Sequence, residues 1–406
     1  MRRTVLLLAS VFLAMLLASG VALGVTPLGD TAEKTDADAT AAAKGPDAAL
    51  DRALKGLVRM EGGPPGVIAV VQRAQSREVH TFGVANLENN RRMKVDDRMR
   101  IASTSKAFSG AVALSLVSKG ALSLDGTIGE RLSDLPDPPP DTWSEVTLGQ
   151  LLNHTSGLPD YSDSDEFRNA LIANPTQPDP PEKLLSYAYD LNNGELLFTP
   201  GTQYHYSNSD NIAVALMVED ATGRTYEGQL QEQVYGPLGL RRTTLPAGAN
   251  LREPFIHGYN LSLPEPDVSE DFAAGWAWAS GGMVSTPADL NTFIRGYVKG
   301  QLYDLHTRAQ QRQAFEGGGS GPPGPGKNSA GLGIFRYETG CGTVWGHTGN
   351  IAGYTQFMAA SPDGKRSATV SINSQLSPPS TGDQDAFEAL RRAEGRAVCA
   401  ALAGKG

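Results

Sequence analysis

The sequence predicts an α+β fold, and this expectation rests on three observations. Near the N-terminus, two apolar-rich segments at 66–72 and 78–85 flank a short polar link, which is typical of a β-hairpin. Between 332 and 372 the apolar side chains recur with a period of two, which indicates further antiparallel strands. Residues 121–275 are expected to be mostly helix and loop. Both ends of the chain therefore supply strands, and its middle supplies helices.

The first 46 residues are not expected to belong to the folded part. Arg2 and Arg3 precede an uncharged run of mostly Leu, Ala and Val, which is typical of a signal peptide over 1–24. The run is nearly long enough to span a bilayer, so an uncleaved N-terminal anchor is the alternative. Residues 25–46 are rich in Ala, Asp and Thr and predict a disordered spacer. We expect a secreted, extracellular protein with one folded domain at 47–402.

The folded part is expected to begin with a helix over 47–60, where leucines recur at helical spacing. After the hairpin, a short extended segment at 98–101 leads to Ser103. The residues that follow are apolar on nearly every side as far as Lys119 and Gly120, which predicts a buried helix ending there. Ser103 is therefore expected at the tip of a rigid rod through the core.

Caps and turn residues predict the later elements. Thr147 and Gln150 form a capping box at the start of a short helix, and proline at the first helical position predicts another start at 286–287. The stretch 317–331 is rich in Gly, Pro and Ser and is expected to be a mobile surface loop. The remaining strands are expected at 332–337, 343–347, 353–360 and 366–372, and the remaining helices at 211–221 and 383–402.

Composition and charge exclude several classes of function. The chain has 406 residues and a net charge of −9, which argues against nucleic acids and anionic membrane surfaces as partners. Its six histidines and two cysteines show no metal-ligand spacing, and it has no glycine-rich phosphate loop. We therefore expect no metal and no cofactor. In an exported protein, the pair Cys341 and Cys399 predicts a disulfide.

The first candidate for chemistry is a Ser-x-x-Lys pair at the entry to the buried helix. Residues three apart share a helix face, so the Ser103 hydroxyl and the Lys106 amine are expected to meet. Serine becomes a nucleophile when a neighbouring base takes its proton, and burial suits lysine to that task by lowering its pKa. A capping serine beside a solvated lysine is the alternative for an isolated match. No other lysine in the chain has a serine three residues before it.

A second candidate is Tyr206-x-Asn208, the only Tyr-x-Asn in the chain. A phenol can relay a proton, and an amide can hold both a substrate and Lys106; a core tyrosine beside a capping asparagine is the alternative. The sequence leaves open whether Lys106 or Tyr206 is the general base. Trp276 is expected either to wall the substrate pocket or to pack in the core. His154 is expected to hold a turn by hydrogen bonds.

A third candidate, His347-Thr348-Gly349-Asn350, lies on a predicted strand. The glycine permits close backbone approach, so a substrate can pair with this strand by edge addition. The backbone N–H groups of Asn350 and Ser103 would then form an oxyanion hole. An unperturbed imidazole titrates near pH 6.5. We therefore expect His347 to favour anionic substrates increasingly as the pH falls from about 8 to 5.

These three motifs, in this order, resemble the serine β-lactamase and penicillin-binding-protein-like family. The fragments at 154–158 and 281–286 look similar as well. The His-Thr-Gly triplet and the cysteine pair most resemble the secreted D-alanyl-D-alanine carboxypeptidase branch. The resemblance covers about 47–402 and implies a β-lactamase/transpeptidase-like fold: an antiparallel sheet flanked by helices, beside an all-helical lobe. The implied sheet lobe is 47–100 with 276–402, and the implied helical lobe is 101–275.

The resemblance also implies an activity, namely serine hydrolysis through an acyl-enzyme on Ser103, with Lys106 and Tyr206 sharing the base and proton-relay work. The implied substrates are small: D-Ala-D-Ala peptides first, then esters or D-amino-acid amides, then β-lactams, which are also expected as covalent ligands. We expect a monomer. A catalytically inactive scaffold that binds peptidoglycan or a partner is the rival from another class. The residues implied to bind substrate are Asn208, Trp276, Arg336, His347, Thr348, Gly349 and Asn350.

One departure from the pattern concerns the substrate's carboxylate. The carboxypeptidase branch carries an arginine on the strand before the first cysteine, where this chain has Phe335 with Arg336 beside it. A shift of one residue moves a side chain to the other face of a strand. Either the register slips locally and Arg336 holds the carboxylate, or recognition is weakened, which favours an esterase or amidase.

Overall fold

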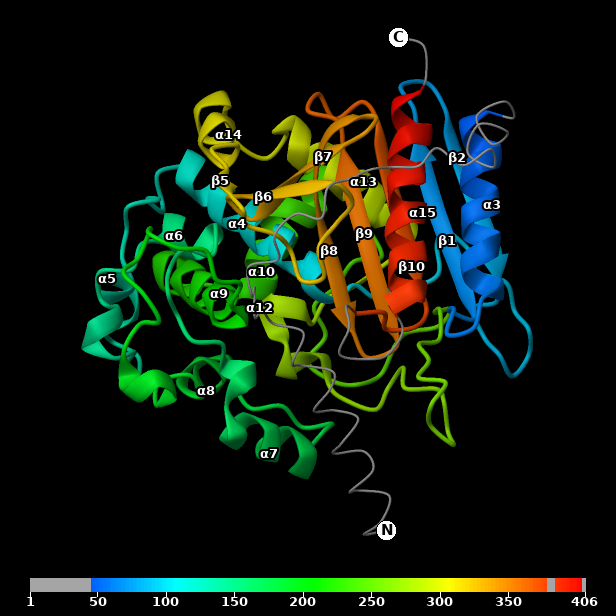
Figure 1. Cartoon of the computed structure of the whole chain (residues 1–406). Coiled ribbons are helices and arrows are strands. Elements are labelled where there is room, and N and C mark those ends of the chain that lie inside the picture. The colour runs from blue at the N-terminus through cyan, green and yellow to red at the C-terminus, as the bar shows by residue number, and fades with distance from the viewer. Residues whose placement is uncertain (1–44, 378–383, 404–406) are drawn as a thin grey trace.

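The computed structural model describes residues 45–377 and 384–403. The predicted signal peptide and nearly all of the predicted spacer lie outside these residues. In the described part of the chain, an eight-stranded antiparallel sheet has the order β2-β1-β10-β9-β8-β7-β6-β5, and helices lie against it (Figure 1). Its strands are β1 (Gly66–Gln72), β2 (Arg77–Gly83), β5 (Phe315–Glu316), β6 (Lys327–Gly331), β7 (Ile334–Thr339), β8 (Gly342–Ile351), β9 (Tyr354–Ala360) and β10 (Ser367–Ile372).

Strands from the two ends of the chain are neighbours in this sheet, as predicted. The β1–β2 hairpin places Val67 opposite Phe82, while β1 also pairs with β10, so that Val67 lies opposite Ile372. Every residue of β1 except Gln72 is buried because elements cover both of its faces. The α+β prediction is confirmed.

The helices α3 and α15 cover one face of the sheet (Figure 1). In α3, Leu50, Leu54 and Leu57 recur at helical spacing and are all buried, which explains why this segment forms an amphipathic helix. The helices of the described residues are α3 (Pro46–Arg59), α4 (Ser105–Ser118), α5 (Ile128–Leu132), α6 (Leu148–Leu152), α7 (Asp165–Ala173), α8 (Pro181–Ser186), α9 (Asn208–Thr222), α10 (Tyr226–Leu230), α11 (Gly236–Leu238), α12 (Trp278–Gly281), α13 (Pro287–Lys299), α14 (Leu305–Gln311) and α15 (Gln384–Leu402).

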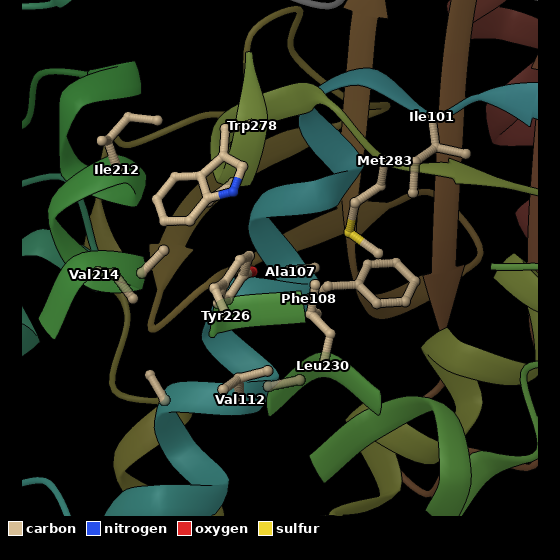
Figure 2. Packing of buried hydrophobic residues seen from close by; sticks show 14 of the residues in the cluster. Ile101, Ala107, Phe108, Val112, Ile212, Val214, Tyr226, Leu230, Trp278 and Met283 are labelled. Atoms are coloured by element: carbon tan, nitrogen blue, oxygen red, sulfur yellow. The ribbon is translucent and has the colours of Figure 1, made fainter. Parts of the chain in front are cut away.

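The helix α4 lies in a second hydrophobic core, separate from the one formed by α3, α15 and the sheet face that they cover. Twelve of its fourteen residues are buried, as its nearly uniform apolar sequence predicts. Figure 2 shows Phe108 and Val112 of α4 beside Tyr226 and Leu230 of α10. The ring of Phe108 also stacks on Phe293 of α13, with 3.6 Å between centroids. This packing fixes the helix whose N-terminal end carries Ser103.

The extended segment predicted at 98–101 contains the short strand β3 (Met99–Arg100), which pairs with β4 (Val284–Ser285) outside the main sheet. One local prediction needs correction. The stretch 317–331 is not simply a surface loop: it ends in β6, and its first part packs against aromatic side chains. The Tyr204 hydroxyl donates to the carbonyl oxygen of Gly319, and Ser320 Oγ lies 3.0 Å from the Tyr337 hydroxyl.

The disulfide between Cys341 and Cys399 is present. It joins the tight connection between β7 and β8 to the last turns of α15, as the cysteine pair predicts. Among the described residues, no helix combines the length and apolar character needed to cross a bilayer.

Candidate active site

A strained turn presents Ser103. It lies in a 3₁₀ turn, η1 (Ala102–Thr104), directly before α4. Ala102 has a φ of 50°, in the left-handed region that residues with a side chain seldom adopt. Such strain persists where the surrounding structure holds it, and it is common at functional sites. Ser103 stays partly exposed, and its Oγ lies 3.2 Å from Lys106 Nζ. The structure brings the two side chains together, as their spacing predicts.

The environment of Lys106 suits a base. Its side chain is buried, and burial lowers its pKa to about 7 because the charged form loses its solvation. Within the described residues its nitrogen contacts Ser103 Oγ, the Ser280 carbonyl oxygen at 2.7 Å and Asn208 Oδ1 at 2.7 Å. The last two are oxygens that only accept hydrogen bonds. A neutral amine that donates to both must turn its lone pair toward Ser103.

A carboxylate fixes the orientation of the Asn208 amide. Asp160 Oδ2 accepts from both Asn208 Nδ2 and the Asn208 backbone N–H, each at 2.9 Å, and Asp160 Oδ1 accepts from the backbone N–H of Ser162 at 2.9 Å. Because Nδ2 faces a carboxylate, Oδ1 must face Lys106. Sequence reasoning missed Asp160; the signal was its position two residues after the His154-Thr155-Ser156-Gly157-Leu158 fragment.

Tyr206 also lies beside this pair. Lys106 Nζ is 4.9 Å from the centroid of its ring. The hydroxyl is buried and makes no hydrogen bond of normal geometry within the described residues. Burial raises the pKa of the Tyr206 phenol above its usual value, and the nearby Ser103 hydroxyl offsets part of that rise. The phenol therefore stays protonated at neutral pH.

The strand β8 closes on η1 because of one glycine. A Cβ added to Gly349 would lie 2.6 Å from the Ile101 carbonyl oxygen, 2.8 Å from the Thr104 nitrogen and 2.9 Å from the Ser103 nitrogen. All three are backbone atoms, so no side-chain rotation relieves the clash. The absence of a side chain lets β8 approach the backbone of the candidate nucleophile, as the close-approach argument predicts.

The structure corrects the expected titration of His347. Its side chain is buried, and burial together with the nearby Lys106 lowers its pKa to about 3. His347 Nδ1 lies 2.5 Å from the Thr348 carbonyl oxygen, and Phe335 contacts the ring edge to face, with 5.0 Å between centroids. His347 is therefore neutral across pH 5–8, so the predicted rise in preference for anionic substrates has no basis there.

Thr348 and Asn350, the two neighbours of Gly349, are held by hydrogen bonds to the surrounding chain. The Thr348 hydroxyl donates to the carbonyl oxygen of Pro322, in the segment that precedes β6. Asn350 Nδ2 donates to Ser377 Oγ, and Asn350 Oδ1 accepts from Thr355 Oγ1 at 2.8 Å. These contacts occupy the side chain of Asn350 and leave its backbone as the part suited to an oxyanion.

Two predicted substrate-binding residues do not join the site. Arg336 pairs with Glu316 on β5 and, at 3.1 Å, with Glu338 on its own strand, rather than with any other predicted site residue; no local register shift turns it inward. Trp276 is only 2% exposed and donates its indole N–H to the Asn174 carbonyl oxygen at 3.1 Å. Trp276 therefore packs in the core and does not wall an open pocket.

A buried histidine–carboxyl pair supports the site from behind. His154 has a φ of 60°, and its Nδ1 lies 2.7 Å from Asp210 Oδ2, while Ser156 Oγ donates to Asp210 Oδ1 at 2.5 Å. Burial lowers the pKa of His154 to about 3 and raises that of Asp210. The His154 ring also packs against Tyr206, with 4.5 Å between centroids. This agrees with the expectation that His154 holds a turn.

Comparisons with known proteins agree with one another. The sequence profile of the family described as Beta-lactamase matches residues 50–393. The D-alanyl-D-alanine-carboxypeptidase/endopeptidase AmpH of Escherichia coli (strain K12) is 26% identical over 254 residues, which are 62% of this chain and 62% of that protein. A D-aminopeptidase of Cereibacter sphaeroides is 28% identical over 335 residues, 81% of this chain and 60% of that protein.

Among solved structures, a D-stereospecific amidohydrolase from Streptomyces sp. superposes with a TM-score of 0.71 and 27% identity. That match covers 84% of this chain and 97% of the other. By contrast, the chain spans about three fifths of the length of the curated relatives it matches.

Proposed function

The chain belongs to the beta-lactamase family of serine hydrolases, and on this premise we propose that it hydrolyses amide bonds of D-amino-acid derivatives through an acyl-enzyme on Ser103. The observation that supports the acyl-enzyme best is the buried Lys106, whose pKa is about 7 and whose Nζ lies 3.2 Å from Ser103 Oγ. The D-configuration is supported by the names of the relatives, among them D-aminopeptidase and D-stereospecific amidohydrolase.

The proposed reaction begins with attack of Ser103 Oγ on the carbonyl carbon, while its proton passes to Lys106 Nζ. The backbone N–H groups of Ser103 and Asn350 stabilise the negative charge on the former carbonyl oxygen. The C–N bond then breaks as the proton moves from Lys106 to the leaving amine, with the Tyr206 hydroxyl as relay. Water attacks the ester, which releases the acid and returns a proton to Ser103.

Lys106 is the better candidate for the base. Burial acts in opposite directions on the two groups, because it disfavours whichever form is charged. It lowers the pKa of the Lys106 ammonium to about 7 and raises that of the Tyr206 phenol. At neutral pH a substantial fraction of Lys106 is a neutral amine, whereas Tyr206 is a proton donor. This supports Lys106 as the general base and Tyr206 as the proton relay, a choice that the sequence leaves open.

The surroundings of the site favour a substrate without a terminal carboxylate. Arg336 is engaged by Glu316, and His347 is neutral, so neither supplies the fixed cation that would hold a carboxylate. We therefore place a D-amino-acid amidase first. A D-alanyl-D-alanine carboxypeptidase is the second candidate, supported by the similarity to AmpH and by the His-Thr-Gly triplet.

We also propose β-lactams as covalent ligands, since they acylate serine nucleophiles of this family, and a secreted monomer as the working form. The disulfide supports an oxidising compartment. Light scattering of the purified chain tests the monomer.

The deciding experiment is a turnover panel with a D-amino-acid amide, its L-enantiomer, a D-Ala-D-Ala peptide, a short acyl ester and nitrocefin. We expect the D-amide to be turned over with the highest kcat/KM. The peptide as the best substrate would replace the first candidate with the second, and turnover of the ester alone would contradict both.

Acylation is tested separately, by mass spectrometry after incubation with a labelled penicillin. An adduct on the Ser103 peptide that disappears in Ser103→Ala supports the nucleophile. Ser109→Ala is the matched control, because Ser109 is a buried serine of the adjoining helix α4, and its hydroxyl donates to the carbonyl oxygens of Ser105 and Ala279. No adduct with any acylating probe would support the inactive scaffold instead.

A further inference from the structure

Four ionisable side chains from α3 and β2 meet on the face of the sheet that carries α3. Asp47 and Asp51 are four residues apart on α3 and so share one side of the helix. Glu78 and His80 are two residues apart on β2 and so share one face of the strand. Three strands separate β2 from β8, so this cluster is distinct from the candidate active site.

The side chain of His80 is the unusual member of the cluster. It is only 9% exposed, yet its Nε2 has no hydrogen-bond partner among the described residues. The nearest carboxylate oxygen, Glu78 Oε2, is 3.9 Å away, beyond hydrogen-bond distance. A buried ring nitrogen without a partner carries a free-energy cost, so it calls for a ligand that the protein itself does not provide.

The other nitrogen of the ring is already committed. His80 Nδ1 lies 2.7 Å from Asp51 Oδ1, which holds the proton on Nδ1 and leaves a lone pair on Nε2. A carboxylate that fixes the tautomer in this way is the usual partner of a metal-binding histidine. One ligand atom from each of Asp47, Glu78 and His80 lies within 4.8 Å of the others.

Arg73 pairs with Asp47 and Glu78 through one oxygen of each carboxylate. Its guanidinium pairs with one oxygen of Asp47 and with Glu78 Oε1, and its Nε donates to the Ala400 carbonyl oxygen on α15. Each carboxylate has a second oxygen that remains able to bind. In the described ion pairs of this cluster, three carboxylates accompany one guanidinium, and this excess of negative charge suits a divalent cation.

We propose that Asp47, Glu78 and His80 form a binding site for a divalent transition-metal ion, with Zn²⁺ as the first candidate and Asp51 as the residue that orients His80. An imidazole ligand favours Zn²⁺ over Ca²⁺ or Mg²⁺, which prefer oxygen ligands alone. Zinc–ligand bonds are about 2.0–2.2 Å, which places ligands about 3.5 Å apart; the partly exposed carboxylates reach this by closing about 1 Å.

Such an ion would join the first helix to the edge strand of the sheet. Its ligands come from segments about 30 residues apart, and no two of them have the spacing of a metal motif, which is why the sequence predicts no metal. The ion plays no part in the proposed acyl transfer, so its binding can be measured whether or not the enzyme is active.

The test is a titration of the tag-free, metal-stripped protein with ZnCl₂, followed by calorimetry and by metal analysis after dialysis. We expect one Zn²⁺ per chain and, at a hundredfold excess over the dissociation constant, a rise in the melting midpoint of about 3–4 °C. CaCl₂ at the same concentration should give no rise. Failure to bind Zn²⁺ would overturn the proposal and leave an imidazole held by Asp51 alone.

The variants separate this site from adventitious binding. His80→Gln should abolish Zn²⁺ binding. Glu78→Gln should weaken Zn²⁺ binding less, because Glu78 is a more exposed ligand than His80. Asp51→Asn should also weaken Zn²⁺ binding, although it removes no ligand. His257→Gln is the matched control: His257 also faces a carboxylate, Asp267, through Nδ1 at 2.6 Å, but its Nε2 is occupied by Asn86 at 2.9 Å. Equal binding by His80→Gln and the unmodified protein would contradict the assignment.

Discussion

Lys106 determines the pH range in which the proposed reaction runs. Its pKa of about 7 follows from burial and is opposed by the nearby carboxylates of Asp160 and Asp210, which favour the charged form. Only the neutral amine can accept the Ser103 proton. The value of kcat/KM should therefore rise with pH, reach half of its plateau near pH 7 and level off above that pH.

We expect this acid limb for every substrate, whatever its charge, because the base belongs to the free enzyme. Lys106→Arg should reduce kcat/KM by about 10²–10⁴-fold, since a guanidinium stays protonated. Rates measured with an uncharged ester from pH 5 to 9 test both statements. A limb centred near pH 10 would contradict the effect of burial on Lys106.

Asp160 acts on the base through Asn208. In Asp160→Asn the amide of Asn208 is free to reverse, and an NH₂ group would then face Lys106. The lost carboxylate also removes a charge that raises the pKa of Lys106. We expect kcat to fall by about tenfold or more and the acid limb to move to lower pH. Asp163→Asn, at an exposed aspartate three residues away, is the control and should leave the limb in place.

His347 should be pH-silent. Because its pKa is about 3, the ratio of kcat/KM for an anionic to a neutral substrate should not change between pH 5 and 8. In His347→Lys a buried cation would raise that ratio, at some expense in melting temperature. A ratio in the unmodified enzyme that falls as the pH rises through 6.5 would show that His347 ionises after all.

At this scale the sequence predicts Ser103, Lys106, Tyr206 and Asn208 because their spacing or their rarity in the chain marks them. It does not predict Asp160, which hydrogen-bonds to the site through Asn208 in the described part of the chain. Nor does it predict the pKa of His347, because that value depends on burial by residues distant in the chain.

At the scale of elements, the approach of β8 to η1 depends on Gly349. A Cβ at this position lies within 3 Å of three backbone atoms, so Gly349→Ala must move the strand away from Ser103. Misplacement by about 1 Å costs about 10²-fold in rate, and we expect a loss of that order in kcat/KM. Gly340→Ala, where a Cβ meets no atom within 4 Å, should be unaffected. Equal activities of the two variants would contradict the role of close approach.

The elements were predictable where one segment carries its own signal. The hairpin, the capping box at Thr147 and the helix α15 follow from local periodicity and caps. The stretch 317–331 was mispredicted because Gly and Pro indicate an irregular backbone, not its exposure. Its packing depends on Tyr204, which is distant in sequence, and on Tyr337 of the following strand β7.

At the scale of the whole molecule, the disulfide closes a loop of 58 residues. The chain-entropy estimate for such a loop is about 4 kcal/mol, which corresponds to a fall of about 5–6 °C in the melting midpoint of a domain this size. The double variant Cys341→Ser with Cys399→Ser should show that fall. Its acylation rate should be unchanged, because neither cysteine touches the site. Two free thiols in the unreduced, denatured protein would contradict the disulfide itself.

The overall architecture was predictable from the distribution of the strands, because period-two segments occur only near the two ends of the folded chain. The order of the strands was not, since periodicity carries no information on which strands are neighbours. The pairing of β1 with β10 is a property of the assembled sheet and of the helices α3 and α15 that cover it.

The pairing of β1 with β10 has a consequence for folding during synthesis. Val67 can pair with Ile372 only after some three hundred further residues have been synthesised. Until then, the β1–β2 hairpin has an unpaired strand edge and an exposed apolar face. Contacts this distant along the chain make folding slow and expose intermediates to self-association. The molecule cannot be completed domain by domain during synthesis. The strand β10 and the helix α15 complete the sheet and its cover. A chain that ends before them should aggregate or be degraded, although it already contains Ser103 and Lys106.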